Sequence, residues 1–379
     1  MKKVYIFALH LAFGGIEKAI ISMANVFCSK YDVEIISVYN MPDSPAFPLD
    51  DRVKVRYLLD DIPNRDEWKN ALKAKNLPAL VRESLRSFKI LAGKKRELIK
   101  AIKEIREGVI ITTRHEDNVM LSRHGADTVY KIAQLHHDHR FDKLYVEGFK
   151  KNYGRIDVLC MLSPGLRDEV IGMVKGENNH TEIIYMPNFL EHYPDNVNKG
   201  NRNKTILAVG RLNSVKRFDL LVSLFAKVHK EFPDWNLRIV GDGEERENIE
   251  ALIRELQMED TVILTGRKDS AGVEEEMLNA SLFAMTSSSE GFPFVLLEAQ
   301  SCGLPVVAFD VRIGPGFVVS EGVDGFLAPE GEEDYYCDKL KMLMSDAELR
   351  FSMGEKAMEH AAKFSADEVS KLWFSLIGE

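Results

Sequence analysis

The sequence predicts an α/β protein of two doubly wound domains, each with a central parallel sheet. Short apolar runs alternate with amphipathic helical runs along almost the whole chain, a pattern typical of strands buried between helices. The length of 379 residues suits two domains better than one. The polar, turn-rich segment 191–204 has no periodicity and separates two such alternating halves, so it is the expected linker.

Each strand is predicted from an apolar run of strand length, and each helix from apolar residues recurring every three or four positions. In the first half, strands are expected at Val4–Leu9, Val33–Val38, Val53–Leu58, Val109–Thr113, Lys131–Leu135, Val158–Leu162 and Ile183–Met186. Helices are expected there at Ile16–Lys30, Ala79–Leu91 and Lys94–Glu107. In the second half, strands are expected at Thr205–Val209, Asn236–Val240, Val262–Thr265, Leu282–Met285 and Val306–Phe309. Helices follow at Arg217–Glu231, Glu244–Leu256 and, at the end of the chain, about Ala366–Ile377.

The composition is that of a globular protein with a large core, since 45% of the residues are hydrophobic. No apolar run approaches the roughly 20 residues that span a bilayer. The run Val4–Leu9 is followed by His10 and by the Gly14-Gly15 pair, so it reads as a first strand and not as a signal peptide. These features predict a cytoplasmic protein. Free buried thiols are expected at four widely spaced cysteines, Cys28, Cys160, Cys302 and Cys337.

The net charge of −9 hides an asymmetry between the two halves. Residues 1–200 hold 31 Lys and Arg against 27 acidic residues, whereas residues 201–379 hold 19 against 32. The basic excess lies in Arg82–Arg106, where apolar side chains are interleaved with the cations. This pattern suits a solvated helix face, and equally a contact with an anionic membrane surface or an anionic acceptor. Nucleic acid is disfavoured because the whole chain is acidic.

The segment from Ser289 to Ala299 holds two carboxylates, Glu290 and Glu298, at the start of an apolar helical run. Gly291 permits close backbone approach to a ligand, and Pro293 suits the first turn of the helix. The free N–H groups of that turn attract an anion such as a phosphate. Two acceptors at different depths suit a ligand with hydroxyls on both sides of a diphosphate, such as a nucleotide sugar.

Arg211 and Lys216 follow the first strand of the second half and a glycine. A planar guanidinium and an ammonium five residues apart are suited to hold a diphosphate, although two solvated loop cations would look the same. Gly241 and Gly243 follow the next strand, where they indicate a tight strand-to-helix turn.

The segment from Ser289 to Ala299 resembles the E-x7-E signature of the retaining glycosyltransferases of family 4, which have the GT-B fold. The stretch from Gly210 to Asp219 resembles the family's G-R-L-x(3)-K-G-x-D motif, except that Arg217 stands where Gly is common. The resemblance implies two Rossmann-like domains that face a central cleft. It implies an acceptor-binding domain at 1–190, a donor-binding domain at 205–364, and a C-terminal helix, 365–379, that crosses back to the first domain.

The resemblance also assigns expected roles. Catalytic roles are expected for His136, Glu290, Arg211 and Lys216. Contacts with the nucleotide sugar are expected for Gly14, Gly15, Gly241, Gly243, Gly291, Phe292, Pro293, Phe294 and Glu298. His137 competes with His136 for the place beside the reacting carbon, Asp138 or His139 would touch the acceptor, and His115 could equally lie in the cleft. No metal is expected, because the histidines lack ligand spacing and no D-x-D motif is present.

The predicted function is metal-independent, retaining transfer of a hexose or N-acetylhexosamine from a nucleoside-diphosphate sugar, with UDP favoured. The expected acceptor is a hydroxyl of a glycan or lipid-linked molecule in bacterial surface polysaccharide synthesis, and no cofactor is expected beyond the donor. Peripheral contact with the inner face of the plasma membrane would run through Arg82–Arg106. The alternatives are a nucleotide-sugar epimerase of GT-B fold and a non-catalytic UDP-sugar-binding subunit. An NAD-dependent dehydrogenase is disfavoured because the G-x-G-x-x-G fingerprint is missing.

Overall fold

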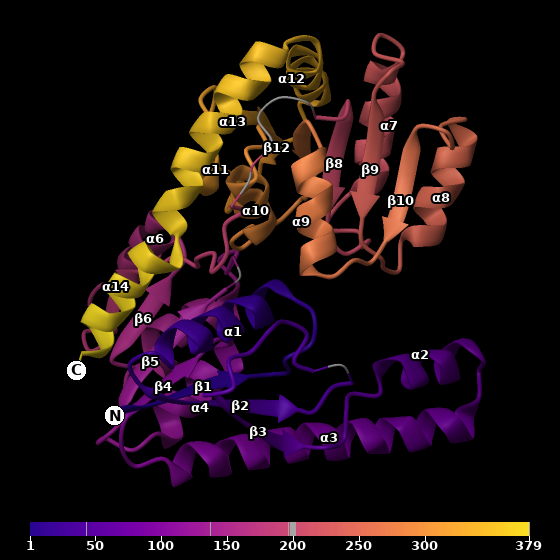
Figure 1. The fold of residues 1–379 in the computed structure, drawn as a ribbon. Coiled ribbons are helices and arrows are strands. Elements are labelled where there is room, and N and C mark those ends of the chain that lie inside the picture. The colour runs from indigo at the N-terminus through magenta and orange to yellow at the C-terminus, as the bar shows by residue number, and fades with distance from the viewer. Residues whose placement is uncertain (43, 137, 196, 198–201, 379) are drawn as a thin grey trace. The chain divides into compact units, whose positions relative to one another are not determined.

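The structure is a computed structural model that describes residues 1–42, 44–136, 138–195, 197 and 202–378. Within these residues the chain divides into two compact units. Unit 1 comprises Met1–Met186 together with the chain from Ser370 onward, and unit 2 comprises Pro187–Val369. Each unit is built on a parallel sheet with helices on both of its faces (Figure 1). The predicted fold class of two doubly wound parallel-sheet domains is therefore confirmed.

Unit 1 has a seven-stranded sheet in the order β3-β2-β1-β4-β5-β6-β7. Its strands are β1 Lys3–Ala8, β2 Asp32–Tyr39, β3 Lys54–Leu59, β4 Val109–Thr112, β5 Tyr130–Leu135, β6 Val158–Met161 and β7 Glu182–Tyr185. Its helices are α1 Gly15–Phe27, α2 Arg65–Lys73, α3 Leu77–Glu104, α4 His115–His124, α5 Lys143–Glu147 with the π-helical turn Gly148–Asn152, and α6 Pro164–Val174.

Unit 2 has a six-stranded sheet in the order β10-β9-β8-β11-β12-β13. Its strands are β8 Thr205–Val209, β9 Asn236–Val240, β10 Val262–Gly266, β11 Leu282–Met285, β12 Val306–Asp310 and β13 Gly325–Pro329. Its helices are α7 Phe218–His229, α8 Arg246–Glu255, α9 Ser270–Asn279, α10 Phe294–Ser301, α11 Pro315–Val318, α12 Glu333–Ser345 and α13 Ala347–Ala361, with a 3₁₀ turn at Ala362–Phe364. Helix α14, Ala366–Ile377, begins in unit 2 and ends in unit 1.

The strand order places one switch point in each sheet. In unit 1 the chain builds outward from β1 in one direction and from β4 in the other, and the two strands pair in parallel. In unit 2 the same happens between β8 and β11. Connections on either side of such a pair run to opposite faces of the sheet, which opens a crevice at the carboxyl ends of the two strands. The loops after these four strands are therefore where a ligand site is expected.

The two helices predicted at Ala79–Leu91 and Lys94–Glu107 are one continuous helix, α3. It begins after Asn76, whose side-chain oxygen accepts a hydrogen bond from the N–H of Ala79 at 3.1 Å. Gly93 lies inside the helix and does not end it. A glycine in a helix interior costs about 1 kcal/mol relative to alanine, which the packing of the C-terminal half of α3 on the sheet outweighs.

The last residues of the chain complete the core of unit 1. Trp373 is fully buried, and its ring lies 5.4 Å from the ring of Phe27 on α1. The backbone carbonyl of Ile377 accepts a hydrogen bond from the ammonium of Lys2 at 2.6 Å. The carbonyl of Gly378 accepts one from the hydroxyl of Tyr31 at 2.9 Å. The end of the chain thus packs against residues from its beginning.

The predicted linker 191–204 lies partly outside the described residues, which omit 196 and 198–201. Among the residues that the structure covers, no helix combines the length and the apolar character needed to cross a membrane. All four cysteines are buried and free, as the sequence predicts.

Candidate active site

Two of the four residues with expected catalytic roles meet at the switch point of unit 2. Lys216 lies in the loop after β8, and Glu290 lies in the loop after β11. The ammonium nitrogen of Lys216 lies 2.6 Å from Oε1 of Glu290, with 23% and 10% of the two side chains exposed. The loops are tied by backbone: the N–H of Ser288 donates to the carbonyl of Val215 at 2.8 Å. Residues 74 positions apart thus form a partly buried ion pair.

Arg211 follows β8 in the same loop, but its guanidinium has a different partner. It donates to Oε2 of Glu244 at 3.1 Å, and both side chains are largely exposed. An exposed pair of this kind contributes at most about 1 kcal/mol, so little opposes its exchange for another anion. The structure pairs Lys216 with Glu290 and directs Arg211 elsewhere. Its role toward a diphosphate stays a prediction.

Gly241 and Gly243 support the loop that carries Arg211. A Cβ atom at Gly241 would lie 1.9 Å from the carbonyl oxygen of Gly210, and one at Gly243 would lie 2.2 Å from that of Leu212. The N–H of Leu212 donates to the carbonyl of Asp242 at 3.0 Å, which holds the two loops together. The G-x-G pattern is therefore explained by close backbone packing. Contact of these glycines with a nucleotide sugar stays a prediction.

Helix α10 begins one residue later than the sequence suggests. Pro293 precedes the helix as its N-cap residue, and the helix starts at Phe294. The rings of Phe292 and Phe294 lie 5.6 Å apart and are buried, and the expected contacts of these two residues with the nucleotide sugar stay predictions. Glu298 is partly exposed on the helix. Contacts of Gly291, Pro293 and Glu298 with a donor remain predictions.

Gly314 is a neighbour of Glu290 that sequence reasoning did not single out for the site. Its φ of +109° is left-handed, and an added Cβ would lie 2.8 Å from the Cβ of Glu290. The R-I-G-P-G run from Arg312 to Gly316 could have indicated it. A side chain at Gly314 would displace Glu290, so this glycine helps to set where the carboxylate lies.

Arg217 stands where the resembling motif commonly has glycine, and its backbone shows why. Its φ of 50° and ψ of 44° are left-handed, immediately before α7. This conformation costs a non-glycine residue about 1 kcal/mol or more. We expect Arg217→Gly to raise the free energy of unfolding by about 0.5–1 kcal/mol in urea denaturation. Arg217→Ala removes the guanidinium but keeps the left-handed backbone, so an equal gain with alanine would contradict this account.

In unit 1 the histidines have separate environments. His136 is buried directly after β5, where its Nε2 lies 3.3 Å from Oε1 of Gln134. His137 lies outside the described residues. His139 is buried, and its Nδ1 accepts a hydrogen bond from the N–H of Phe141 at 3.0 Å. Oδ1 of Asp138 accepts one from the backbone N–H of Arg140 at 2.9 Å. His139 and Asp138 thus shape the loop, and contact of His136 with a sugar stays a prediction.

His115 is a core residue of unit 1. Its Nδ1 lies 2.8 Å from the hydroxyl of Tyr153, and its ring lies 4.7 Å from the ring of Tyr145. A Cβ added to Gly148 would lie 2.3 Å from the imidazole ring. Burial lowers the pKa of His115, which keeps the imidazole neutral near pH 7. These contacts hold the imidazole of His115 inside unit 1, and the cleft position that the sequence allowed for it stays a prediction.

A charged cluster that sequence reasoning missed lies at the switch point of unit 1. Glu17 is buried on α1, and its Oε1 lies 3.2 Å from a guanidinium nitrogen of Arg114, which follows β4. The same oxygen lies 3.5 Å from Nδ1 of His10, which follows β1. Glu17 also lies over Gly14, since an added Cβ there would be 2.0 Å from Oε2. Gly14 and Gly15 therefore open α1 beside a charged cluster at the carboxyl edge of the sheet.

Asp117 lies one turn beyond Arg114 and is 1% exposed, with no hydrogen-bond partner for either carboxyl oxygen among the described residues. Burial raises its pKa to about 6. Because the folded pKa exceeds the unfolded one, the ionised carboxyl destabilises the fold above pH 6, and this cost disappears as the pH falls below 4. We expect Asp117→Asn to raise the free energy of unfolding by up to about 3 kcal/mol at pH 7.5.

Urea denaturation at pH 7.5 and pH 4.5 checks this prediction. The gain from Asp117→Asn should shrink at the lower pH, because the wild-type carboxyl is then mostly protonated. The matched control is Asp338→Asn, at an exposed carboxylate on α12. An Asp117→Asn gain that did not change with pH would contradict a buried ionised carboxyl.

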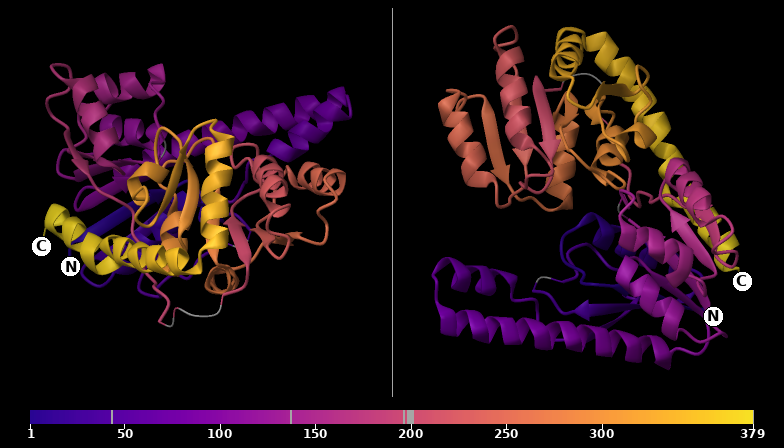
Figure 2. Two further views of the ribbon diagram at one scale, coloured as in Figure 1. Left: turned by 90° about the horizontal axis from the view of Figure 1, so that it is seen from above. Right: turned by 180° about the vertical axis from the view of Figure 1, so that it is seen from behind.

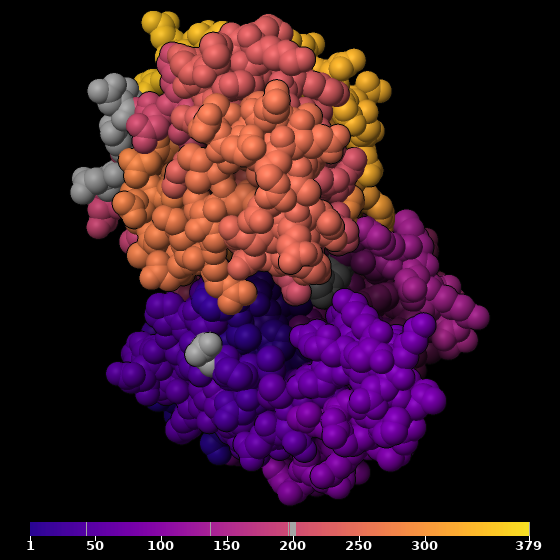
Figure 3. All heavy atoms as spheres, turned by 90° about the vertical axis from the view of Figure 1, so that its right-hand side faces the viewer, coloured from indigo at the N-terminus to yellow at the C-terminus, as the bar shows by residue number. Residues whose placement is uncertain are grey.

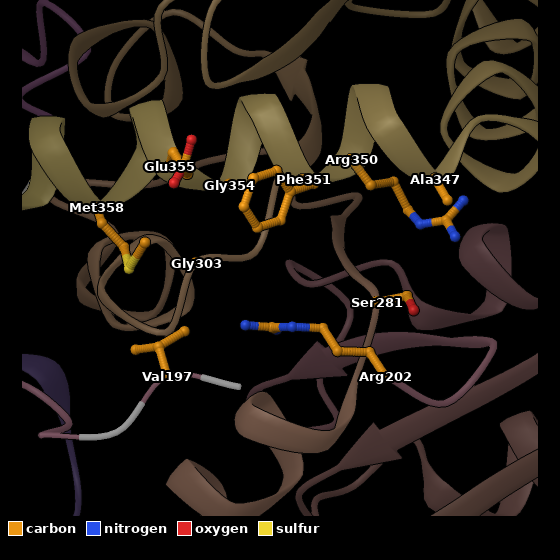
Figure 4. Close-up of a pocket in the computed structure, with 10 residues that line it drawn as sticks. All are labelled: Val197, Arg202, Ser281, Gly303, Ala347, Arg350, Phe351, Gly354, Glu355 and Met358. Atoms are coloured by element: carbon orange, nitrogen blue, oxygen red, sulfur yellow. The ribbon is translucent and has the colours of Figure 1, made fainter. Parts of the chain in front are cut away.

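The described residues contain no group of three or more His, Cys, Asp or Glu side chains placed to hold a metal ion. A cavity of about 100 Å³ in unit 2 is lined by Arg202, Ser281 and Gly303 among others (Figure 4), and neither Lys216 nor Glu290 is among its lining residues. The guanidinium of Arg202 at its edge donates to the carbonyls of Ala280 and Cys302, where α9 and α10 end. Its charge thus complements two helix C-termini, so the cavity is a packing feature.

Three comparisons place the chain among known proteins. Residues 191–360 match the family model described as "Glycosyl transferases group 1". The chain is 30% identical over 382 residues to an exopolysaccharide phosphotransferase of Streptomyces coelicolor, covering 97% of this chain but only 39% of that relative. It is 25% identical over 381 residues, 98% of both chains, to the N-acetylgalactosamine-N,N'-diacetylbacillosaminyl-diphospho-undecaprenol 4-alpha-N-acetylgalactosaminyltransferase of Campylobacter jejuni.

Among solved structures, a mutant of TarM from S. aureus in complex with fondaparinux, alpha-GlcNAc-glycerol and UDP has a TM-score of 0.78 at 16% identity, with 100% of both chains covered. That likeness establishes the fold of the whole chain, whereas the family match covers its second half. Residues 191–360 therefore match the model of group 1 of the glycosyl transferases, and the chain as a whole has the GT-B fold.

Proposed function

We propose that the protein is a retaining, metal-independent glycosyltransferase that uses a UDP-hexose or UDP-N-acetylhexosamine. The acceptor is a hydroxyl of a glycan or lipid-linked molecule in bacterial surface polysaccharide synthesis, at the inner face of the plasma membrane. The observation that carries the proposal is the Lys216–Glu290 pair at the switch point of unit 2. Two of the proteins named above support the substrate classes. The Campylobacter jejuni relative is named for a diphospho-undecaprenol acceptor, and the TarM structure was solved with UDP.

The pair suits a donor that is anionic at one end and rich in hydroxyls at the other. The ammonium of Lys216 has three N–H donors, of which Glu290 takes one, so the others remain to hold a diphosphate oxygen. Glu290 would accept hydrogen bonds from sugar hydroxyls, and Glu298 from the ribose. Arg211 and the N–H groups that open α10 would add positive charge as the diphosphate leaves. Preorganised charge of this kind is worth several kcal/mol in a transition state.

In the proposed reaction the bond between the anomeric carbon and the diphosphate oxygen breaks. The acceptor oxygen forms its bond to the same face of that carbon, and its proton passes to the departing phosphate oxygen. His136 would lie beside the sugar. The sequence offers no obvious protein nucleophile for this step. A front-face path requires none.

A UDP-release assay over a panel of nucleotide sugars tests the proposal, with and without lipid-linked or polymeric glycan acceptors, and with EDTA added in a parallel series. Release that an acceptor stimulates and EDTA leaves unchanged is the expected result. Interconversion of UDP-sugars without an acceptor would instead identify an epimerase. Donor binding without turnover across the whole panel would identify a binding subunit. The anomeric configuration of the product, read by NMR, decides between retention and inversion.

A further inference from the structure

We propose that the exposed half of α3 docks unit 1 on an anionic membrane surface. The proposal deepens the function proposed above by naming the surface at which the acceptor is met. The identity of the acceptor rests on that proposed function, whereas the membrane docking is argued from the residues of α3 alone. Helix α3 projects beyond the sheet of unit 1, past the carboxyl ends of β2 and β3 (Figure 1), and both views of Figure 2 show the same projection.

The projecting half of α3 carries an apolar stripe that we define as Leu77, Val81, Leu85, Phe88 and Leu91. Successive members are four or three residues apart, so they share one face of the helix. All five are exposed, and Phe88 and Leu77 are 73% and 71% exposed. A soluble helix normally turns such a face toward a core. Here the core-facing positions are others, including the buried Ile90 and Leu98.

A basic stripe runs beside the apolar one. It consists of Arg82, Arg86, Lys89, Arg96 and Lys100, again at spacings of three, four and seven. Glu83 and Glu97 pair with Arg82 and Arg96, each at 2.8 Å, yet both arginines stay largely exposed. Along all of α3, eight Lys and Arg residues stand against three Glu. An apolar face bordered by cations is the pattern of helices that lie in the headgroup region of anionic bilayers.

Hydrogen bonds from α2 and from the residue before it hold the part of α3 that carries the apolar stripe. The amide of the buried Asn64, just before α2, donates to the carboxylate of Glu83 on α3 at 2.8 Å. Ser87 donates back to the amide oxygen of Asn64 at 2.8 Å, and the indole of Trp68 donates to Ser84 at 3.0 Å. This network holds α2 against α3. Helices α2 and α3 form a helical hairpin, and its tip faces the viewer in the space-filling view of Figure 3.

Charge decides between a membrane and a second copy of the chain. A symmetric pairing of two α3 helices through the apolar stripe would bring together two helices that each carry a net positive charge, which is unfavourable. Anionic headgroups would complement the same cations. The hairpin also projects on the side where β1, β4 and β5 end. A docked hairpin would therefore bring the loops of His10, Arg114 and His136 toward a lipid-linked acceptor.

Co-sedimentation with vesicles tests the proposal in the absence of any sugar donor. The full chain should bind vesicles of phosphatidylcholine with phosphatidylglycerol and stay in the supernatant with phosphatidylcholine alone. The double variant Leu85→Ser, Phe88→Ser should bind at least about tenfold more weakly. The triple variant Lys89→Gln, Arg96→Gln, Lys100→Gln should bind about a hundredfold more weakly. Controls at exposed positions elsewhere are Leu372→Ser and the pair Lys230→Gln, Arg254→Gln, which should bind like the wild type.

Wild-type protein that stays in the supernatant with both vesicle types would overturn the proposal. Oligomers that dissociate in the Leu85→Ser, Phe88→Ser variant, with no vesicle binding, would overturn it too and assign the stripe to a second copy. Turnover of a water-soluble acceptor analogue separates this inference from the proposed function. The stripe variants should keep that turnover while they lose turnover of acceptor embedded in vesicles. Equal loss of both would overturn the docking role.

Discussion

Lys216→Ala is expected to slow acceptor-stimulated UDP release by about 10²- to 10³-fold, which is the usual cost of losing one preorganised charge at a leaving group. Lys216 forms a 2.6 Å ion pair with Glu290 at the switch point of unit 2, so its ammonium is already in place before a donor binds. The loss should fall mainly on kcat, because the charge on the diphosphate is greatest in the transition state. Initial rates over a range of donor concentration measure it.

Removal of the ammonium also leaves the Glu290 carboxylate without this partner, which we expect to cost about 1–3 kcal/mol of stability. Circular dichroism at the assay temperature establishes that the variant is folded. Lys227→Ala is the matched control, because Lys227 forms a 2.9 Å pair with Glu333 that is exposed and distant from Glu290 in sequence. It should retain the wild-type rate. A folded Lys216→Ala variant that also retains that rate would remove Lys216 from the mechanism.

Gly241→Ala is expected to lower the free energy of unfolding by about 3 kcal/mol or more, and to abolish donor binding in any folded fraction. The added Cβ would lie 1.9 Å from the backbone oxygen of Gly210, which no side-chain rotation relieves. The φ of +143° adds strain for any L-residue with a side chain. Relief requires movement of the loop that carries Arg211. Urea denaturation and titration with UDP measure the two effects.

Two further glycines separate the two causes of the expected loss, which are steric overlap of the added Cβ and backbone strain at positive φ. Gly243→Ala meets the oxygen of Leu212 at 2.2 Å without a positive φ, so it tests close approach alone. Gly266 has a φ of +76° and open space around its Cβ position, so Gly266→Ala tests backbone strain alone, at about 1 kcal/mol. We expect Gly241→Ala to cost the most and Gly266→Ala the least. The reverse order would contradict close backbone packing as the reason for the G-x-G pattern.

The strands were the most predictable part of the fold. Predicted and observed bounds coincide at Thr205–Val209, Asn236–Val240 and Leu282–Met285. These runs are mostly apolar because both faces of a parallel sheet are covered, and Gly210, Gly241 and Thr286 mark where they end. Lys216 and Glu290 could be selected for a related reason, since each lies in the loop after such a strand. Sequence position alone thus indicated which loops open toward a ligand.

What could not be predicted depends on strand order and on buried contacts. The cluster of Glu17, Arg114 and His10 forms only because β1 and β4 are neighbours in the sheet, although about a hundred residues separate them in the chain. The partner of Arg211 could not be predicted for a similar reason, because Glu244 comes from the loop after a neighbouring strand. Continuity of α3 through Gly93 depends on packing against the sheet, which outweighs the local cost of glycine.

The discontinuous composition of unit 1 has a consequence for how the chain folds as it is made. Every residue of unit 2 precedes Ser370, so unit 2 needs nothing that is made after Val369. Unit 1 begins first but waits for the segment from Ser370 onward, because Phe27 packs against Trp373 and Tyr31 donates to the carbonyl of Gly378. The unit whose synthesis begins first is therefore the one whose core is completed last.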